Sequence, residues 1–569
     1  MLRLNNFIVT LLVLISLSAQ SQLDGETTPS YPELIEIYKE LAANNSEIEL
    51  YNMGDSDFGL PIYVCLVNAC QDSVKSFNTA RNKTTVLINN GIHPGEPDGI
   101  NASLIWINEW IKGGKKTKNL PIIAIIPSYN VGGTINRSSS SRANQDGPQE
   151  YGFRGNAQNL DLNRDFIKMD SKNMMTFARI FHALDPDVFV DTHVSNGADY
   201  QYTLTYIASV KERMAPSLAK LTHDEFIPLL EKDLMKEDFD LIPYVNLVED
   251  VPEKGMSVFN DLPRYSMGYA SLFNTISFTV ETHMLKPFNQ RTKATLEFLR
   301  STIDWTGDNM EEIEVSREKA FLHDLELAQF PYNYQLSEDR DSILFHGYEF
   351  SHPKSEVTGY ERLKYHQDQP YAKFIPYYQT YTALDTIDVP AYYVIGGQCT
   401  DVIERLKMNG VVLKPIDEII HLDLESTRIA SFLSSKQPYE GHFLHWEVKT
   451  SRIDGAVLPV KQNDVVVSTN QRHRRFIVSV LEPKMADSYF AWNFFDSYLQ
   501  QKEHFSSYVF EDKASEILKS NPALKIEFES KKLEDEDFRV NPRAQLDFIY
   551  KHSEYYEPTH NVIPIQKGF

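Results

Sequence analysis

Cysteine is scarce in this sequence: Cys65, Cys70 and Cys399 are the three thiols among 569 residues. Three thiols cannot build the disulfide framework that small exported domains rely on. Cys65 and Cys70 are close enough in sequence to pair across a tight turn, and Cys399 would then be the odd one. None of the three has neighbours that indicate a nucleophile, so the sequence gives no support to thiol catalysis.

Positive charge is also in short supply. Lysine and arginine number 56 against 79 aspartate and glutamate residues, which gives a formal net charge of −23. A chain this acidic repels nucleic acids and anionic membrane surfaces. No nucleic-acid-binding motif is visible either, so we expect no nucleic acid among the partners.

Long apolar runs are missing, and the longest candidate lies at the N-terminus. Arg3 precedes an apolar run of 11 residues, Phe7 to Leu17, which is too short to span a bilayer comfortably. Ala19-Gln20-Ser21 then offers small residues at the positions that a signal peptidase reads. The pattern predicts a signal peptide over residues 1–21 and a secreted or periplasmic protein. The alternative is an uncleaved membrane anchor.

The first half of the chain alternates between strand-like and helix-like segments. Strands are predicted at 84–89, 122–126, 188–190 and 276–280, and helices at 100–112, 172–184 and 290–303. The continuous β-branched run at 122–126 is typical of a strand covered on both faces. We therefore predict an α/β domain over residues 31–306, with a mixed, mainly parallel sheet and helices on both faces.

The second half has a different character. A charged stretch at 308–319 is followed by tyrosine- and proline-rich sequence that predicts β structure over 330–393. A strand, a helix and a strand are predicted within 390–416, further β structure at 465–480 and a helix at 514–519. We expect residues 320–569 to form an accessory region of one or two domains, with β-rich and α/β parts.

His93 and Glu96 follow the strand predicted at 84–89. An imidazole and a carboxylate three residues apart can bind one Zn²⁺ and leave room for a third ligand and an open position. The same spacing recurs at His323/Glu326 and His346/Glu349, but these copies have no polar companions at other strand ends. We interpret both as structural.

His193 is the candidate third ligand, because it follows the apolar strand at 188–190. A lone histidine in that position is more often structural, but here a second metal-binding motif lies after another strand. Ligands of open α/β sheets bind beyond the carboxyl ends of the strands. A set of two histidines and one glutamate with an open position suits catalytic zinc, one ion per chain.

Three further sets of polar residues complete the candidate site. Asn163 and Arg164 place an amide beside a guanidinium, which together can grip a carboxylate. Arg154 supplies a second guanidinium upstream. Glu281 ends the apolar strand at 276–280, where burial would raise its pKa and suit it to proton transfer.

The ordered set His-x-x-Glu, Asp-Leu-Asn-Arg, Asp-Thr-His and a strand-terminal Glu resembles the M14 (carboxypeptidase A-like) family of zinc carboxypeptidases. The resemblance covers residues 31–305, about half of the chain. It implies zinc ligands, a pair that holds the terminal carboxylate of the substrate, a general base and an arginine facing the scissile carbonyl. By this resemblance the zinc ligands are His93, Glu96 and His193, and the pair that holds the terminal carboxylate is Asn163 and Arg164. The general base is Glu281, and the arginine that faces the scissile carbonyl is Arg154.

Two assignments stay open in this resemblance. Arg137 and Arg142 are rivals of Arg154 for the carbonyl-facing position. The mobile tyrosine of the family has no clear match, and Tyr265 and Tyr269 are the candidates for a substrate-capping residue.

The resemblance implies a secreted zinc metallocarboxypeptidase whose partner is a peptide or small amide substrate. One alternative is a zinc amidohydrolase or deacylase acting on acyl-amino acids or cell-wall peptides, because related deacylases also have a short separation between the counterparts of Asn163 and His193. The other is a peptide-binding protein with a decayed site, against which stands the complete set of chemical positions. The oligomeric state is open.

Overall fold

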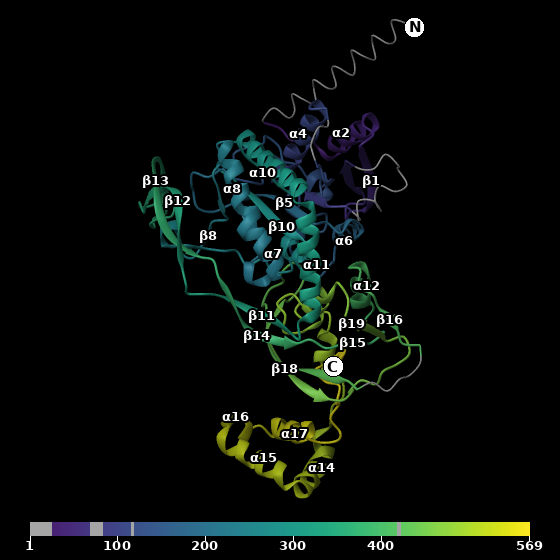
Figure 1. The fold of residues 1–569 in the computed structure, drawn as a ribbon. Helices are drawn as coiled ribbons and strands as arrows, with labels where there is room; N and C mark the ends of the chain where they lie inside the picture. Colours follow the sequence, from purple (N-terminus) through teal and green to yellow (C-terminus); the bar gives the residue numbers. More distant parts are fainter. Residues whose placement is uncertain (1–25, 69–82, 115–118, 418–422) are drawn as a thin grey trace.

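The computed structural model describes residues 26–68, 83–114, 119–417 and 423–569 (Figure 1). The predicted signal peptide at 1–21 lies outside these residues, and so does Cys70. The possible Cys65–Cys70 disulfide therefore stays a prediction, although Cys65 itself is fully buried. Among the helices described, none combines the length and the apolar character needed to cross a membrane.

An eight-stranded mixed sheet organises the first half of the chain, in the order β1-β2-β4-β3-β5-β10-β6-β7. Its central strands β4, β3, β5 and β10 run parallel, and antiparallel pairings join β1 to β2, β2 to β4 and β6 to β10. The strands are β1 Ile48–Asp55, β2 Pro61–Val67, β3 Thr85–Asn89, β4 Ile122–Ile126, β5 Val188–Ser195, β6 Leu204–Ala208, β7 Leu241–Pro243 and β10 Ile276–His283. The predicted α/β fold is confirmed.

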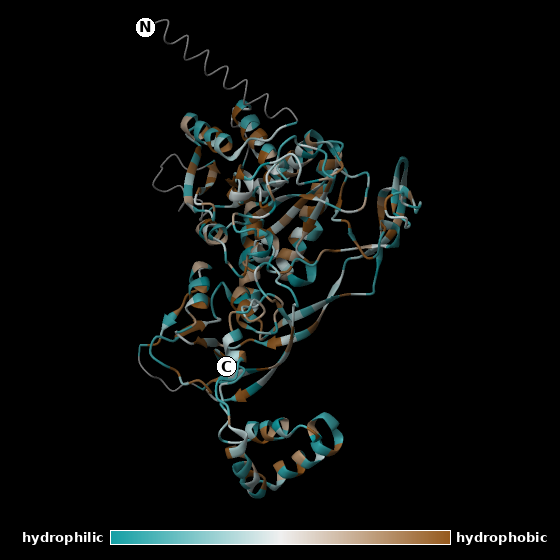
Figure 2. Ribbon diagram, turned by 180° about the vertical axis from the view of Figure 1, so that it is seen from behind, coloured by the Kyte–Doolittle hydropathy of each residue, from teal (hydrophilic) through white to brown (hydrophobic). Residues whose placement is uncertain are grey.

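The sheet is covered on both faces because its strands alternate apolar side chains between two cores. Val86 and Ile88 of β3 face the core that includes α4 (Asp98–Lys112) and α10 (Phe288–Asp308). Leu87 of the same strand faces the other core, shared with α6 (Lys172–Leu184) and α9 (Ser266–Ser271). Hydrophobic residues are prominent on the strands inside this body (Figure 2).

The second core continues into the C-terminal half. Tyr393 and Ile395 of β15 (Tyr392–Ile395) and Phe476 of α13 (Arg474–Leu481) belong to the same buried cluster as Leu87 and Phe177. A six-stranded sheet frames this part of the chain, in the order β16-β19-β15-β20-β17-β18. Besides β15, its strands are β16 Lys414–Pro415, β17 Glu425–Ser434, β18 His445–Asp454, β19 Val465–Ser468 and β20 Val562–Gly568. The two halves are therefore packed through one continuous apolar core.

The remaining elements of the C-terminal half match the sequence prediction in part. Strands β11 Gln329–Leu336, β12 Asp341–Ser351, β13 Lys364–Tyr378 and β14 Tyr381–Asp388 confirm β structure over 330–393, and β15, α12 (Thr400–Met408) and β16 (Lys414–Pro415) confirm the strand, helix and strand. The prediction of β structure throughout 465–480 is wrong: β19 spans Val465–Ser468, but Arg474–Leu481 is helical. A short apolar run that is buried all round has no periodicity that separates a strand from a helix.

The proposed division between catalytic and accessory regions stays a prediction. The β12–β13 hairpin pairs with β9 (Met256–Ser257) of the first half, through Tyr377 and Met256. The hairpin and the first half also share a small core that includes Tyr200 and Phe345. The hairpin therefore belongs structurally with the strands before it.

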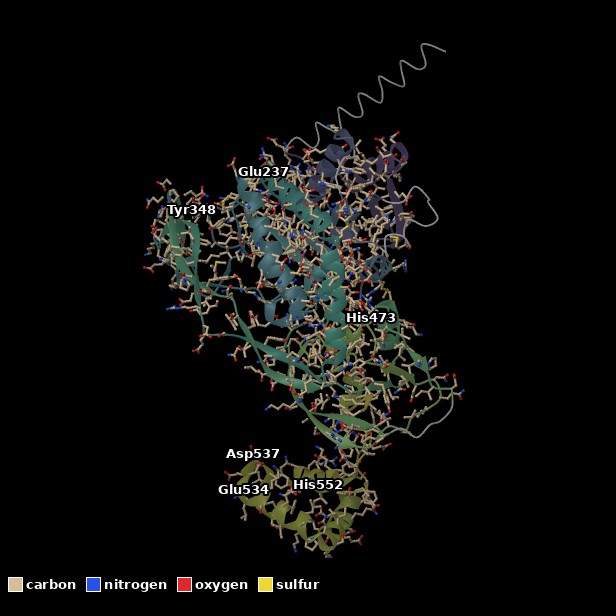
Figure 3. All side chains as sticks on the ribbon, in the orientation of Figure 1. Glu237, Tyr348, His473, Glu534, Asp537 and His552 are labelled. Carbon is tan, nitrogen blue, oxygen red and sulfur yellow. The ribbon has the colours of Figure 1, made fainter. Side chains whose placement is uncertain are left out.

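Helices α14 (Ser507–Ser520), α15 (Pro522–Glu534), α16 (Glu536–Arg539) and α17 (Pro542–Lys551) form a module at one end of the molecule (Figure 1). It has its own core, which includes Phe510, Phe528 and Tyr550. Glu534, Asp537 and His552 lie on this module, far from Tyr348 on the β12–β13 hairpin (Figure 3).

Gly99 of α4 leaves no room for a side chain, and we predict that Gly99→Ala is strongly destabilising. An added Cβ would lie 2.0 Å from Thr192 Oγ1 and 2.4 Å from Asn90 Oδ1, both on buried side chains. Overpacking of this kind costs about 1–3 kcal/mol. Denaturant unfolding should show that loss, while Glu109→Ala on the exposed face of α4 stays within about 0.5 kcal/mol of wild type. An unchanged Gly99→Ala variant would contradict the packing.

Candidate functional site

The sheet topology brings together side chains that are far apart in sequence. β5 and β10 are parallel neighbours, and their register pairs His193 directly with Glu281. β3 lies on the other side of β5, and the turn that follows it carries His93 and Glu96 into α4. Parallel strands end at one edge of the sheet, so these residues meet there.

His93, Glu96 and His193 form a cluster that could hold one metal ion, and no other such cluster occurs within the described ranges. The Nδ1 atoms of the two histidines are 3.2 Å apart, and Glu96 Oε2 lies 3.3 Å from His93 Nδ1 and 3.1 Å from His193 Nδ1. Ligand atoms about 2.0–2.1 Å from a tetrahedral zinc ion are about 3.3 Å from one another. The donor set therefore fits a zinc ion.

Two aspartates fix the orientation of the histidine rings. His93 Nε2 is 3.0 Å from Asp161 Oδ1, and His193 Nε2 is 2.8 Å from Asp191 Oδ2. An Nε2–H that donates to a carboxylate leaves the Nδ1 lone pair for a metal, as is usual for metal-binding histidines. Both aspartates stand in the motifs Asp-Leu-Asn-Arg and Asp-Thr-His, yet sequence analysis gave them no role. The signal that could have found Asp161 and Asp191 is that each is a carboxylate inside a motif that carries other candidate site residues.

The ionised form of the carboxylates is strongly favoured. Burial opposes the charge on Glu96, but His93 and Arg142 outweigh it and hold the pKa of Glu96 well below its ordinary value. Burial likewise opposes the charge on Asp161, and His93 with Arg154 brings its pKa far below the usual range. Both groups are therefore charged and available at neutral pH.

Glu281 behaves in the opposite way. It opens onto the cavity but is otherwise enclosed by protein, and this burial raises its pKa to about 8, against the attraction of His193 and with the repulsion of Glu96. A carboxylate with a raised pKa is a better proton acceptor than a solvated one. The sequence predicted this direction from the position of Glu281 at the end of an apolar strand.

The three candidate arginines separate clearly. Arg154 is held by Asp161 at 2.9 Å and approaches Glu96 at 3.6 Å, with about half of its side chain exposed (47%). Arg142 donates to the same oxygen of Glu96, Oε1, at 2.7 Å. Arg137 does not line the cavity and instead donates to the backbone carbonyls of Thr28 and Pro29. The structure therefore does not bring Arg137 to the cavity with the other two arginines.

Asn163 and Arg164 lie on the same cavity. Asn163 Oδ1 accepts a hydrogen bond from the backbone N–H of Ser266 at 3.0 Å, which leaves the amide Nδ2 as the donor for a ligand. The Arg164 guanidinium lies 4.6 Å from the ring centre of Tyr265, which also lines the cavity.

Tyr269 is the sequence candidate that the structure removes from the site. It is fully buried, and its hydroxyl donates to Asn409 Oδ1 at 2.6 Å. Tyr265 is the N-cap of helix α9, and Tyr269 lies inside that helix, on the face packed against the core. The prediction treated the two tyrosines alike because the sequence does not show which helical face is covered.

The cavity has a volume of roughly 410 Å³, within the range of small-ligand sites. Tyr244, Phe259 and Thr279 also line it, and sequence analysis missed all three. Thr279 precedes Glu281 by two residues on the same strand, so period-two alternation was a signal for it. Tyr244 and Phe259 come from irregular segments, where no periodicity was available.

The other copies of His-x-x-Glu lie elsewhere. His323 is on α11 (Met310–Glu326), 3.7 Å from Asp324. His346 is on the β12–β13 hairpin, 3.3 Å from Asp240. The interpretation of both copies as structural agrees with their absence from the metal-binding cluster among the described residues.

Residues 34–185 match the family model described as zinc carboxypeptidase. The chain is 22% identical to Carboxypeptidase 2 of Trichophyton rubrum over 495 residues, an alignment that covers 82% of this chain and 84% of that protein. Carboxypeptidase 2 of Trichophyton equinum is 23% identical over 489 residues, with coverage of 82% and 84%. Alignments of this length extend into the C-terminal half.

Solved structures also match about half of the chain. A metallo-carboxypeptidase from Burkholderia cenocepacia aligns with a TM-score of 0.36 and 16% identity, covering 48% of this chain and 68% of that one. Carboxypeptidase A from Helicoverpa armigera aligns with a TM-score of 0.36 and 15% identity, covering 52% and 75%.

The matched segment 34–185 contains His93, Glu96, Arg154, Asn163 and Arg164, and the sheet adds His193 and Glu281 to the same cavity. Residues 34–185 thus match the zinc carboxypeptidase family, and this match together with the similarity to Carboxypeptidase 2 of Trichophyton rubrum supports a peptide hydrolase.

Proposed function

We propose that the protein is a zinc-dependent metallocarboxypeptidase that removes the C-terminal residue of peptides. The observation that carries this proposal is the arrangement of one cavity. It combines three donor atoms at tetrahedral-zinc spacing, a half-buried glutamate in register with one of them, and an amide and a guanidinium that could together hold a carboxylate.

His93, Glu96 and His193 would hold the zinc ion, which when bound would acidify a water molecule and polarise a carbonyl group. Glu281 is in register with His193 and would accept the proton of the attacking water. It would then deliver that proton to the leaving amine. Its raised pKa suits this shuttle, because the carboxylate gains a proton more readily than an ordinary glutamate does.

Recognition of the substrate would be divided between two groups of donors. Arg154 lies half-exposed beside Glu96 and would hydrogen-bond the oxyanion that develops on the scissile carbonyl. Asn163 and Arg164 would bind the free C-terminal carboxylate and thereby place the last peptide bond at the reacting groups. Tyr265, stacked against Arg164, would close over the bound residue.

We also propose that the protein is exported, on the basis of the signal-peptide pattern at residues 1–21. Export would deliver the enzyme to extracellular or periplasmic peptides, and sequencing the N-terminus of the mature protein tests it directly.

Removal of one histidine should abolish the metal site. We expect wild type to bind one zinc ion per chain and His193→Ala to bind none at equal free zinc, because two remaining donors are too few for a stable site. His323→Ala removes a histidine from another His-x-x-Glu pair and should keep the full stoichiometry. Elemental analysis after dialysis measures all three. A His193→Ala variant that retains one zinc would contradict the assignment.

Glu281→Gln should separate metal binding from turnover. The amide keeps the shape of the side chain but cannot accept the proton of water, so we expect unchanged zinc content and a fall in kcat of at least about 100-fold. Steady-state hydrolysis of an N-acylated dipeptide measures kcat. Near-normal turnover would assign the base elsewhere.

The free carboxylate of the substrate should be essential. Amidation of the C-terminus removes the charge that Asn163 and Arg164 would bind, so we expect cleavage of the amidated peptide to be at least about 100-fold slower. Rates for matched free and amidated peptides, compared by product chromatography, provide the measurement. Equal cleavage of both forms would favour the amidohydrolase alternative.

A further inference from the structure

A tight turn of the C-terminal half lies against the cavity-forming segment of the catalytic half. Residues 439–442 form a turn within the connection between β17 (Glu425–Ser434) and β18 (His445–Asp454). The backbone N–H of Tyr439 donates to the carbonyl of His442 at 2.7 Å, and the reverse bond measures 3.0 Å. Glu440 and Gly441 both have positive φ, +48° and +84°, as in a type I′ hairpin turn.

The turn contacts two residues that matter to the site. Arg164 Nε donates to the Tyr439 hydroxyl at 3.0 Å, while Arg164 Nη1 donates to the carbonyl of Asn163 at 2.8 Å. These two bonds fix the plane of the guanidinium. The backbone N–H of Asp161 donates to Glu440 Oε2 at 2.7 Å. Asp161 is the residue whose carboxylate orients both His93 and Arg154.

The turn is itself held in place from both sides. His442 Nε2 is 2.8 Å from Asp170 Oδ2 in the catalytic half. The ring of Tyr439 stacks on buried Trp492 with centroids 6.1 Å apart. A non-glycine residue at positive φ is strained, and Glu440 holds this conformation where glycine would fit more easily. A carboxylate is therefore kept at a position whose backbone favours a smaller residue.

We propose that Tyr439 and Glu440 are positioning residues of the active site, supplied by the C-terminal half. The inference rests on the proposed function. Tyr439 orients Arg164 for the substrate carboxylate, and Glu440 fixes the backbone of Asp161 and, through it, the ring of His93. The C-terminal half then helps to arrange the active site. Substitution of Tyr439 should change substrate binding, and substitution of Glu440 should change zinc affinity.

Tyr439→Phe tests the first contact, because it removes one hydroxyl and keeps the stacking on Trp492. We expect KM for a free-acid N-acylated dipeptide to rise about three- to tenfold, with kcat within twofold and no change for the amidated dipeptide. Tyr498→Phe is the matched control, since its hydroxyl contacts Gln398 within the C-terminal half. The control should keep the wild-type KM. An unchanged KM in Tyr439→Phe, or an equal loss on both peptides, overturns the role of Tyr439.

Glu440→Gly tests the second contact without straining the turn. We expect zinc affinity to fall about three- to tenfold, while the unfolding midpoint stays equal to or above that of wild type. Glu440→Gln, which retains an acceptor oxygen, should restore most of the affinity. Competition with a chromophoric chelator gives the zinc Kd of the full-length chain without any substrate. Wild-type affinity in Glu440→Gly overturns the role of Glu440.

The two readouts also separate this inference from the proposed function. If wild type binds zinc but cleaves neither peptide, the proposed function fails, while the zinc affinities of the Glu440 variants still decide the contact to Asp161. If wild type is active and both variants match it, the C-terminal half has no positioning role and the proposed function stands.

Discussion

The parallel alignment of β3, β5 and β10 is the constraint on which this protein depends. It places the turn after β3, the carboxyl end of β5 and that of β10 at one edge of the sheet, so residues nearly two hundred positions apart share a cavity. The strands hold their register because both faces are buried in apolar cores, where a slip of one residue would turn every side chain to the wrong face.

The cavity concentrates charge in a largely buried place and pairs each charge with a partner. Asp161 and Asp191 each face a histidine, and Arg142 and Arg154 approach the same oxygen of Glu96. Buried ionic groups are costly unless they are paired in this way. Glu281 is the exception, because the negative charges around it and its burial raise its pKa. Burial in this cavity, with the nearby charges of Glu96 and Asp191, thus raises the pKa of Glu281, the proposed proton acceptor.

The C-terminal half is joined to the catalytic half by a shared apolar core and by polar contacts near the cavity. One core runs from Leu87 and Phe177 of the catalytic half to Phe476 of the other, and polar contacts at Asp161, Arg164 and Asp170 join the turn at 439–442 to the cavity. The accessory region predicted from the sequence thus contacts Arg164, which lines the cavity, and Asp161 beside it. Only the helical module α14–α17 has a core of its own.

The sequence by itself determined the α/β pattern and the candidate site residues His93, Glu96, His193 and Glu281, because these are local signals of periodicity and of residue type at strand ends. Tertiary structure decided that Arg142 and Arg154, and not Arg137, lie near Glu96. It decided as well that Tyr265 lines the cavity while Tyr269 is buried in the core. It also decided that Tyr439 meets Arg164 across 275 positions of sequence. Such choices depend on which helical face is covered and which loops meet, and these follow from long-range packing that no local pattern encodes.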